Sequence, residues 1–172
     1  MNKKRTILGG AILVAVLMLG IGYAAINAIT LNIGGTATAD ANDANFIVQF
    51  DSDTAVTTSG DGTITASITD EKNAVLNVSG LSAKGQVATA TYTIENESPD
   101  LSAKLTVDAE SITETDNAGY FSIETTIAQA TLASKGKTTA TVTVTLNKTP
   151  VDAQKTGTIN VKLKATPEQP TN

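Results

Sequence analysis

The stretch Ala88-Thr89-Ala90-Thr91-Tyr92-Thr93-Ile94 is the clearest indication of the fold, because every second residue is apolar and every residue between is threonine. Successive side chains of a β-strand point to opposite faces, so this alternation gives one buried and one solvated face. Threonine suits the solvated face because its branched Cβ fits the pleat and its hydroxyl stays hydrated. Residues 139–146 repeat the pattern with Ala140, Val142, Val144 and Leu146. Both stretches predict half-buried strands.

Further runs of the same kind lie on either side of these two. Alternating or apolar stretches occupy residues 29–33, 46–50, 63–69, 74–78, 103–107, 121–126 and 159–165. Turn-forming sequences such as Gly60-Asp61-Gly62 and Asp116-Asn117-Ala118-Gly119 separate them. The spacing predicts an all-β fold, a single antiparallel β-sandwich of eight or nine strands, jelly-roll or immunoglobulin-like. Residues 127–132 fit either a helical turn or a strand extension.

The first 24 residues have the layout of a secretory signal peptide. The basic Lys3-Lys4-Arg5 precedes an apolar run at residues 7–21, and Gly22 and Ala24 are small residues three and one before a cut ahead of Ala25. The run of fifteen residues is shorter than the roughly 20 that a membrane-spanning helix needs. The sequence predicts a protein that is secreted to the cell surface or extracellular matrix, with an uncleaved N-terminal anchor as the alternative.

The predicted organisation has four parts. Residues 1–24 are the signal peptide, 25–39 an N-terminal extension, 40–165 the sandwich domain and 166–172 a disordered polar tail. Loss of the three basic residues of the signal changes the net charge from −5 to −8. Such an acidic chain disfavours nucleic acid as a partner. No cysteine is present, so packing and strand pairing must stabilise the domain.

The chain contains no histidine, and this excludes many chemistries. Histidine is the usual general base near neutral pH and the commonest metal ligand, so a Ser-His-Asp triad or an HExxH zinc site cannot form. We therefore expect no catalytic residues, no metal ligands and no cofactor. Asp51, Asp53 and Asp61 leave calcium binding as a milder alternative, although Ala55 stands where an EF-hand loop needs its third ligand.

Two stretches carry a resemblance to a known family. Gly20-Ile21-Gly22-Tyr23-Ala24-Ala25-Ile26-Asn27 precedes a Thr/Ala-rich segment and a β domain, and residues 76–85 are followed by Tyr92-Thr93-Ile94-Glu95-Asn96-Glu97. The chain resembles the TasA/camelysin family of Firmicute surface and biofilm-matrix proteins, except that Ser82-Ala83-Lys84-Gly85 stands where the family often has proline. The resemblance implies processing by a dedicated signal peptidase and assembly into extracellular fibres by donor-strand exchange.

The segment Ala25–Ile33 is the candidate donor strand. Ile29, Leu31 and Ile33 alternate with polar residues, and Gly34-Gly35 follow as a hinge with little conformational restriction. In a neighbour's groove, three buried aliphatic side chains at roughly 1.5–3 kcal/mol each give a gross gain of about 5–9 kcal/mol. The expected partner is a second copy in a head-to-tail homopolymer, with room for minor matrix co-subunits.

Two alternatives stand beside this expectation. The segment could pair within its own sheet as an ordinary first strand. The protein could also be a monomeric cell-surface adhesive or protein-binding sandwich. Camelysin itself has been described as a protease, but a chain without histidine has no zinc ligand of that kind.

Overall fold

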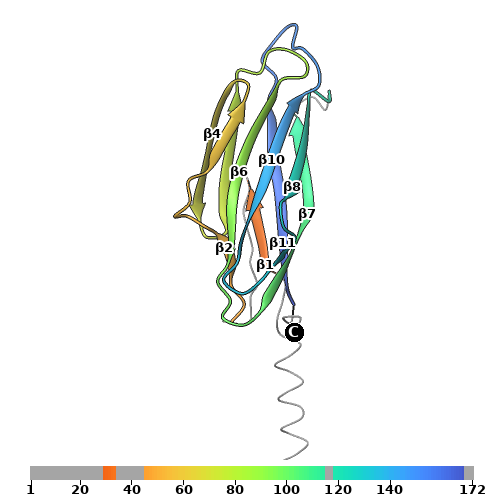
Figure 1. Cartoon of the computed structure of the whole chain (residues 1–172). Coiled ribbons are helices and arrows are strands. Elements are labelled where there is room, and N and C mark those ends of the chain that lie inside the picture. The colour runs from red at the N-terminus through yellow and green to blue at the C-terminus, as the bar shows by residue number, and fades with distance from the viewer. Residues whose placement is uncertain (1–28, 34–44, 115–117, 169–172) are drawn as a thin grey trace, which may run out of the picture.

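The structure is a computed structural model that describes residues 29–33, 45–114 and 118–168, and these residues form strands and turns without a helix (Figure 1). The described residues contain eleven strands. They are β1 (Ile29–Ile33), β2 (Val48–Phe50), β3 (Thr57–Gly60), β4 (Thr63–Asp70), β5 (Asn73–Ser79), β6 (Val87–Asn96), β7 (Ser102–Glu114), β8 (Phe121–Ile127), β9 (Thr131–Leu132), β10 (Lys137–Leu146) and β11 (Gly157–Glu168). The all-β prediction is confirmed.

The strands form two sheets. The first has the order β4-β5-β1-β11-β7-β9, and the second has the order β2-β6-β10-β8 with β3 also paired to β6. Neighbouring strands are antiparallel except for β1 and β5, which run parallel. The exception has a simple cause. β1 comes from the N-terminal segment rather than from a hairpin, so no tight turn fixes its direction relative to β5.

The buried faces of both sheets share one core. In β6 and β10 the alternate residues that the sequence assigned to the core are at most 2% exposed, among them Ala88, Tyr92 and Val144. The Tyr92 hydroxyl donates a hydrogen bond of 2.9 Å to the Val75 carbonyl of β5 in the other sheet. Burial raises the pKa of Tyr92 above its ordinary value. The tyrosine therefore links the two layers through a neutral hydroxyl.

Two stretches differ from the simple alternation. Residues 127–132 do not form a helical turn: Ile127 ends β8, residues 128–130 are irregular, and Thr131–Leu132 form β9, which pairs with β7. β3 was not expected, since its Thr57-Thr58-Ser59-Gly60 carries no apolar residue and is exposed throughout. It pairs with residues 88–91 of β6 through the backbone alone. A strand without a buried face leaves no periodic signal in the sequence.

The predicted polar tail begins too early. Residues 166–168 belong to β11 and lie opposite Lys104, Ala103 and Ser102 of β7. Proline is tolerated where a strand needs only one hydrogen-bonded neighbour, and the described part of β1 ends its pairing at Ala165, before Pro167. The pairing of β11 with β7 therefore continues through Pro167 to Glu168.

A buried aspartate ties β2 to the neighbouring strands. Asp51 is 2% exposed, and its Oδ2 lies 2.6 Å from Lys137 Nζ of β10 and 2.6 Å from the hydroxyl of Thr54. The hydrogen bond from Lys137, followed by that from Thr54, lowers the pKa of Asp51 from 3.8 to about 2. The ion pair therefore stabilises the fold wherever Asp51 is ionised.

We expect this pair to give the stability a defined dependence on pH. Because the pKa of Asp51 is lower in the folded chain, its contribution is fully present above about pH 4 and is lost as the pH falls towards 2. The loss is at most about 2 kcal/mol, since the lysine end is half exposed. Chemical unfolding of the wild type and Asp51→Asn at several pH values measures it. An unchanged slope between pH 2 and 4 in Asp51→Asn would contradict the assignment.

Candidate functional site

The described residues hold no group of three or more histidine, cysteine, aspartate or glutamate side chains placed to bind a metal ion. Of the three aspartates considered as calcium ligands, Asp51 accepts the hydrogen bonds given above, and Asp61 accepts one of 2.9 Å from the backbone N–H of Val87. These carboxylates hold loops against neighbouring strands. The structural feature that stands out lies instead in the six-stranded sheet.

β1 fills a slot between β5 and β11. On one side it pairs with β11 from Ile29↔Ala165 to Ile33↔Val161, and on the other it pairs with β5 only at Asn32↔Asn73 and Ile33↔Ala74. The order of the sheet shows what β1 does, because β5 is otherwise bonded to β4, and β11 is otherwise bonded to β7. Without β1, the pair β4-β5 would be separated from the group β11-β7-β9. Figure 1 shows β1 beside β11. A strand from the N-terminal segment therefore completes the sheet.

The register of β1 agrees in phase with the sequence pattern. Ile29, Leu31 and Ile33 lie opposite Ala165, Leu163 and Val161 of β11. These three residues of β11 are fully buried, at 0% exposure. Thr30 and Asn32 lie opposite Lys164 and Lys162 instead. The predicted donor-strand residues thus stand at the register positions that border the core.

A single chain keeps this strand in its own sheet. The expected swing of Ala25–Ile33 away from its own domain is not what one copy shows, since β1 is paired on both sides. The arrangement is that of the ordinary first strand named above as the alternative. The cleavage residues Ala24 and Ala25 and the hinge residues Gly34 and Gly35 lie outside the described residues, as does the signal segment.

β1 occupies only part of the slot. Val75–Ser79 of β5 and Gly157–Asn160 of β11 pair with β4 and β7 respectively, and no described residue pairs with them on the sides that face each other. A cavity of about 580 Å³ opens at this point. We call it the open groove.

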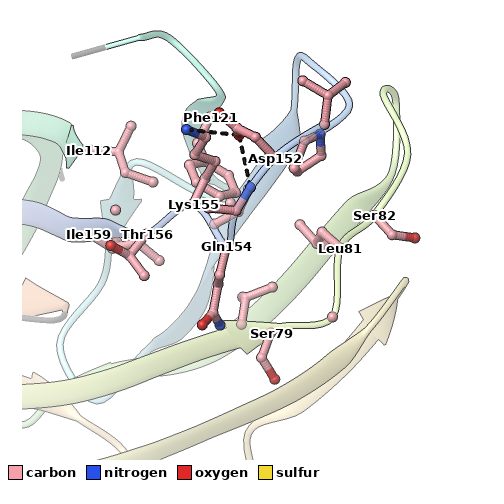
Figure 2. A pocket seen from close by; sticks show the side chains of 17 residues that line it. Ser79, Leu81, Ser82, Ile112, Phe121, Asp152, Gln154, Lys155, Thr156 and Ile159 are labelled. Atoms are coloured by element: carbon pink, nitrogen blue, oxygen red, sulfur yellow. Dashed lines mark hydrogen bonds and ion pairs between the residues drawn. The ribbon is translucent and has the colours of Figure 1, made fainter. Parts of the chain in front are cut away.

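The open groove has apolar walls from both sheets. Each of five strands contributes an apolar side chain to its lining: Val78 of β5, Ile112 of β7, Phe121 of β8, Val144 of β10 and Ile159 of β11. Figure 2 shows Leu81 on one side of the groove and Ile159 and Ile112 on the other. The groove therefore continues the β1 slot and opens directly onto the core of the sandwich.

The connection between β10 and β11 borders one end of the groove. Residues 150–156 line it, and within this stretch Lys155 Nζ lies 3.4 Å from a carboxylate oxygen of Asp152 and 5.1 Å from the ring centroid of Tyr120. Val151 is 86% exposed, the one large apolar side chain among the described residues with such exposure. No sequence motif indicates this groove, because a gap between two strands arises from strand pairing, which a local sequence pattern does not record.

Comparisons with protein-family models, with curated proteins and with solved structures find no match. Within the described residues there is also no helix long and apolar enough to cross a membrane. The function must therefore be argued from the slot, its strand and the groove.

Proposed function

We propose that this chain is a secreted structural subunit of an extracellular surface or biofilm-matrix filament, assembled head-to-tail by donor-strand exchange of its mature N-terminus. One observation carries the proposal: a strand from the N-terminal segment is what joins the two parts of the six-stranded sheet among the described residues. The resemblance to the TasA/camelysin family points to the same function. The absence of histidine fits a structural rather than a catalytic role.

The slot can accept β1 from its own chain or from a second copy, because the contacts made inside the slot are the same in both cases. A short terminal strand is the kind of element that exchanges readily. β1 has five residues and pairs with β5 at only two register positions. Leaving the slot therefore breaks few hydrogen bonds compared with any of the long strands.

Exchange in this geometry produces an open chain of subunits. Each copy donates one strand and offers one slot, so the two surfaces of the contact differ and the assembly does not close by symmetry alone. Main-chain pairing along the inserted strand supplies affinity, and the buried neighbours Val161, Leu163 and Ala165 select apolar residues at alternate positions.

A disulfide cross-link tests the exchange directly, since the chain has no cysteine of its own. Thr30 and Lys164 lie opposite each other in the β1–β11 pair. Directly opposite residues of an antiparallel pair are near enough for an engineered disulfide. We expect the single variants Thr30→Cys and Lys164→Cys of the mature chain, mixed during assembly and then oxidised, to give covalent dimers. The mixture can form this bond only between two chains.

The double variant Thr30→Cys/Lys164→Cys separates this function from its alternative. A donor-strand filament gives a ladder of covalent multimers on a non-reducing gel. A monomeric adhesive or protein-binding sandwich, which β1 seated in its own sheet favours, gives monomers closed by an internal disulfide. Monomers alone, with no dimers from the mixed single variants, would rule out the exchange.

A further inference from the structure

The direction of β1 points its chain towards the open groove. β1 runs parallel to β5, so beyond Ile33 a straight strand would follow β5 from Ala74 towards Ser79. β2, the next described strand in the chain, lies at the other end of β5. The N–H of Phe50 donates a hydrogen bond of 2.8 Å to the carbonyl of Glu71, just before β5 begins at Asn73.

These directions distinguish the two ways of filling the slot. When β1 and β2 belong to the same copy, residues 34–47 have to return from Ile33 to Val48, wherever in that segment the chain reverses. A chain whose β1 lies in a second copy has no such requirement and can continue straight. The straight path leads between Val75–Ser79 of β5 and Gly157–Asn160 of β11, the two edges without a described partner strand.

We propose that in the filament residues 34–37 of the donor copy occupy the open groove of the acceptor, so that the donor's sandwich lies beyond the groove at residues 150–156. This inference rests on the proposed donor-strand exchange. It adds the side of the acceptor on which the donor's sandwich lies and the length of the inserted strand. Continuing the β1–β11 register places Thr36 of the donor opposite Thr158 of the acceptor. The paired strand grows from five residues to about nine in contact with β11.

The chemistry of the groove and of its occupant agrees. The edges of β5 and β11 present backbone groups that a further stretch of strand can pair. Residues 34–39 read Gly-Gly-Thr-Ala-Thr-Ala, which contains no charge, no proline and no large side chain. Their small side chains need little room in the groove beside residues 150–156. A proline would remove a hydrogen-bond donor from the ladder.

The exposed Val151 lies where the donor's sandwich would sit. Its 86% exposure in a single copy is unusual for the described part of this chain, and a subunit stacked at that end would cover it. Contacts of residues 34–37 with the groove would add to those that β1 makes in the slot, so a longer inserted strand would hold two copies together more firmly.

Four pairwise mixtures of single cysteine variants test the inference. The donors are Thr30→Cys and Thr36→Cys, and the acceptors are Lys164→Cys and Thr158→Cys. Thr158 is exposed in β11, so its substitution leaves the core untouched. We expect oxidised filaments to yield covalent dimers of comparable amount from Thr30→Cys with Lys164→Cys and from Thr36→Cys with Thr158→Cys. The two mismatched mixtures serve as matched controls and should give only background.

The outcomes separate the two levels of the proposal. Dimers from both matched mixtures support exchange and the straight path through the groove. Dimers from the Thr30 and Lys164 pair alone overturn the inference and leave donor-strand exchange standing. No dimers from either matched mixture overturn both. An internal disulfide in the double variant Thr36→Cys/Thr158→Cys, with monomers only, would show that the groove belongs to the chain's own segment.

Discussion

A mature chain that lacks residues 25–33 is expected to form no filaments under conditions in which the complete mature chain polymerises. The deletion removes β1, the strand that joins β5 to β11. No copy then has a strand to donate to the space between β5 and β11. Electron microscopy and sedimentation of the two chains measure the difference directly.

The same deletion should weaken the isolated domain. Without β1, the residues opposite it in β11 lose their cover on one side, and Val161 and Leu163 are fully buried when β1 is present. Exposure of apolar side chains at a new edge lowers the free energy of unfolding by a few kcal/mol. The melting temperature of the truncated chain should therefore fall well below that of the complete one.

A synthetic peptide of residues 25–33 should restore what the deletion removes. A ligand that binds only the folded state at 100 times its Kd adds about 2.7 kcal/mol of stability. For a chain of this size that corresponds to a rise of roughly 5–10 °C in melting temperature. The same peptide carrying Leu31→Lys is the matched control, because a charged residue opposite the buried Leu163 cannot be accommodated without loss.

The peptide also keeps the experiment decisive if the truncated chain folds poorly. Rescue of the folded signal by the wild-type peptide, and not by the control peptide, demonstrates a slot that accepts the strand from outside the chain. Filaments formed by the truncated chain would show that polymerisation uses another surface. No thermal shift with the wild-type peptide, in a truncated chain that still folds, would show that the slot does not take up a strand in trans.

The sequence predicts best those strands in which apolar and polar residues alternate along the chain. Strands β6 and β10 were placed because apolar residues and threonines alternate through them, and Tyr92 and Val144 are buried as that alternation requires. The register of β1 also agrees with its alternation, since Leu31 stands opposite the buried Leu163. Phase follows from side-chain chemistry, which a sequence displays residue by residue.

Pairing partners and directions were beyond the same reasoning. Nothing in residues 29–33 states that β1 lies between β5 and β11 or that it runs parallel to β5, because a strand's neighbours are chosen by the whole sheet. The open groove could not be predicted from the sequence for the same reason, because it is a stretch where two strands lack a partner and not a sequence motif. Pro167 led to the opposite error: proline was expected to end the strand, but β11 remains paired with β7 at and beyond this residue.

Asn96 is the second position where we expect a large effect, in this case on stability alone. It is fully buried at the end of β6, and its Nδ2 donates to the carbonyls of Leu101, Leu132 and Ala133 at 2.8, 3.4 and 3.1 Å. Its Oδ1 accepts a hydrogen bond of 3.1 Å from the backbone N–H of Ser98. One amide side chain therefore joins the turn after β6 to β9 and the residue that follows it.

Asn96→Leu keeps the approximate size of the side chain and removes all of these hydrogen bonds at once. Several buried backbone groups then lack a partner, and each unsatisfied group costs about 1–3 kcal/mol. We expect a loss of about 3–5 kcal/mol in the free energy of unfolding, measured from urea denaturation midpoints at constant m-value. The matched control is Thr138→Val, which removes a single hydrogen bond of 2.9 Å to the N–H of Gln129 and should cost about 1 kcal/mol. Equal losses in the two variants would mean that the carbonyls around Asn96 find other partners, and that its amide is not what holds this end of the sandwich together.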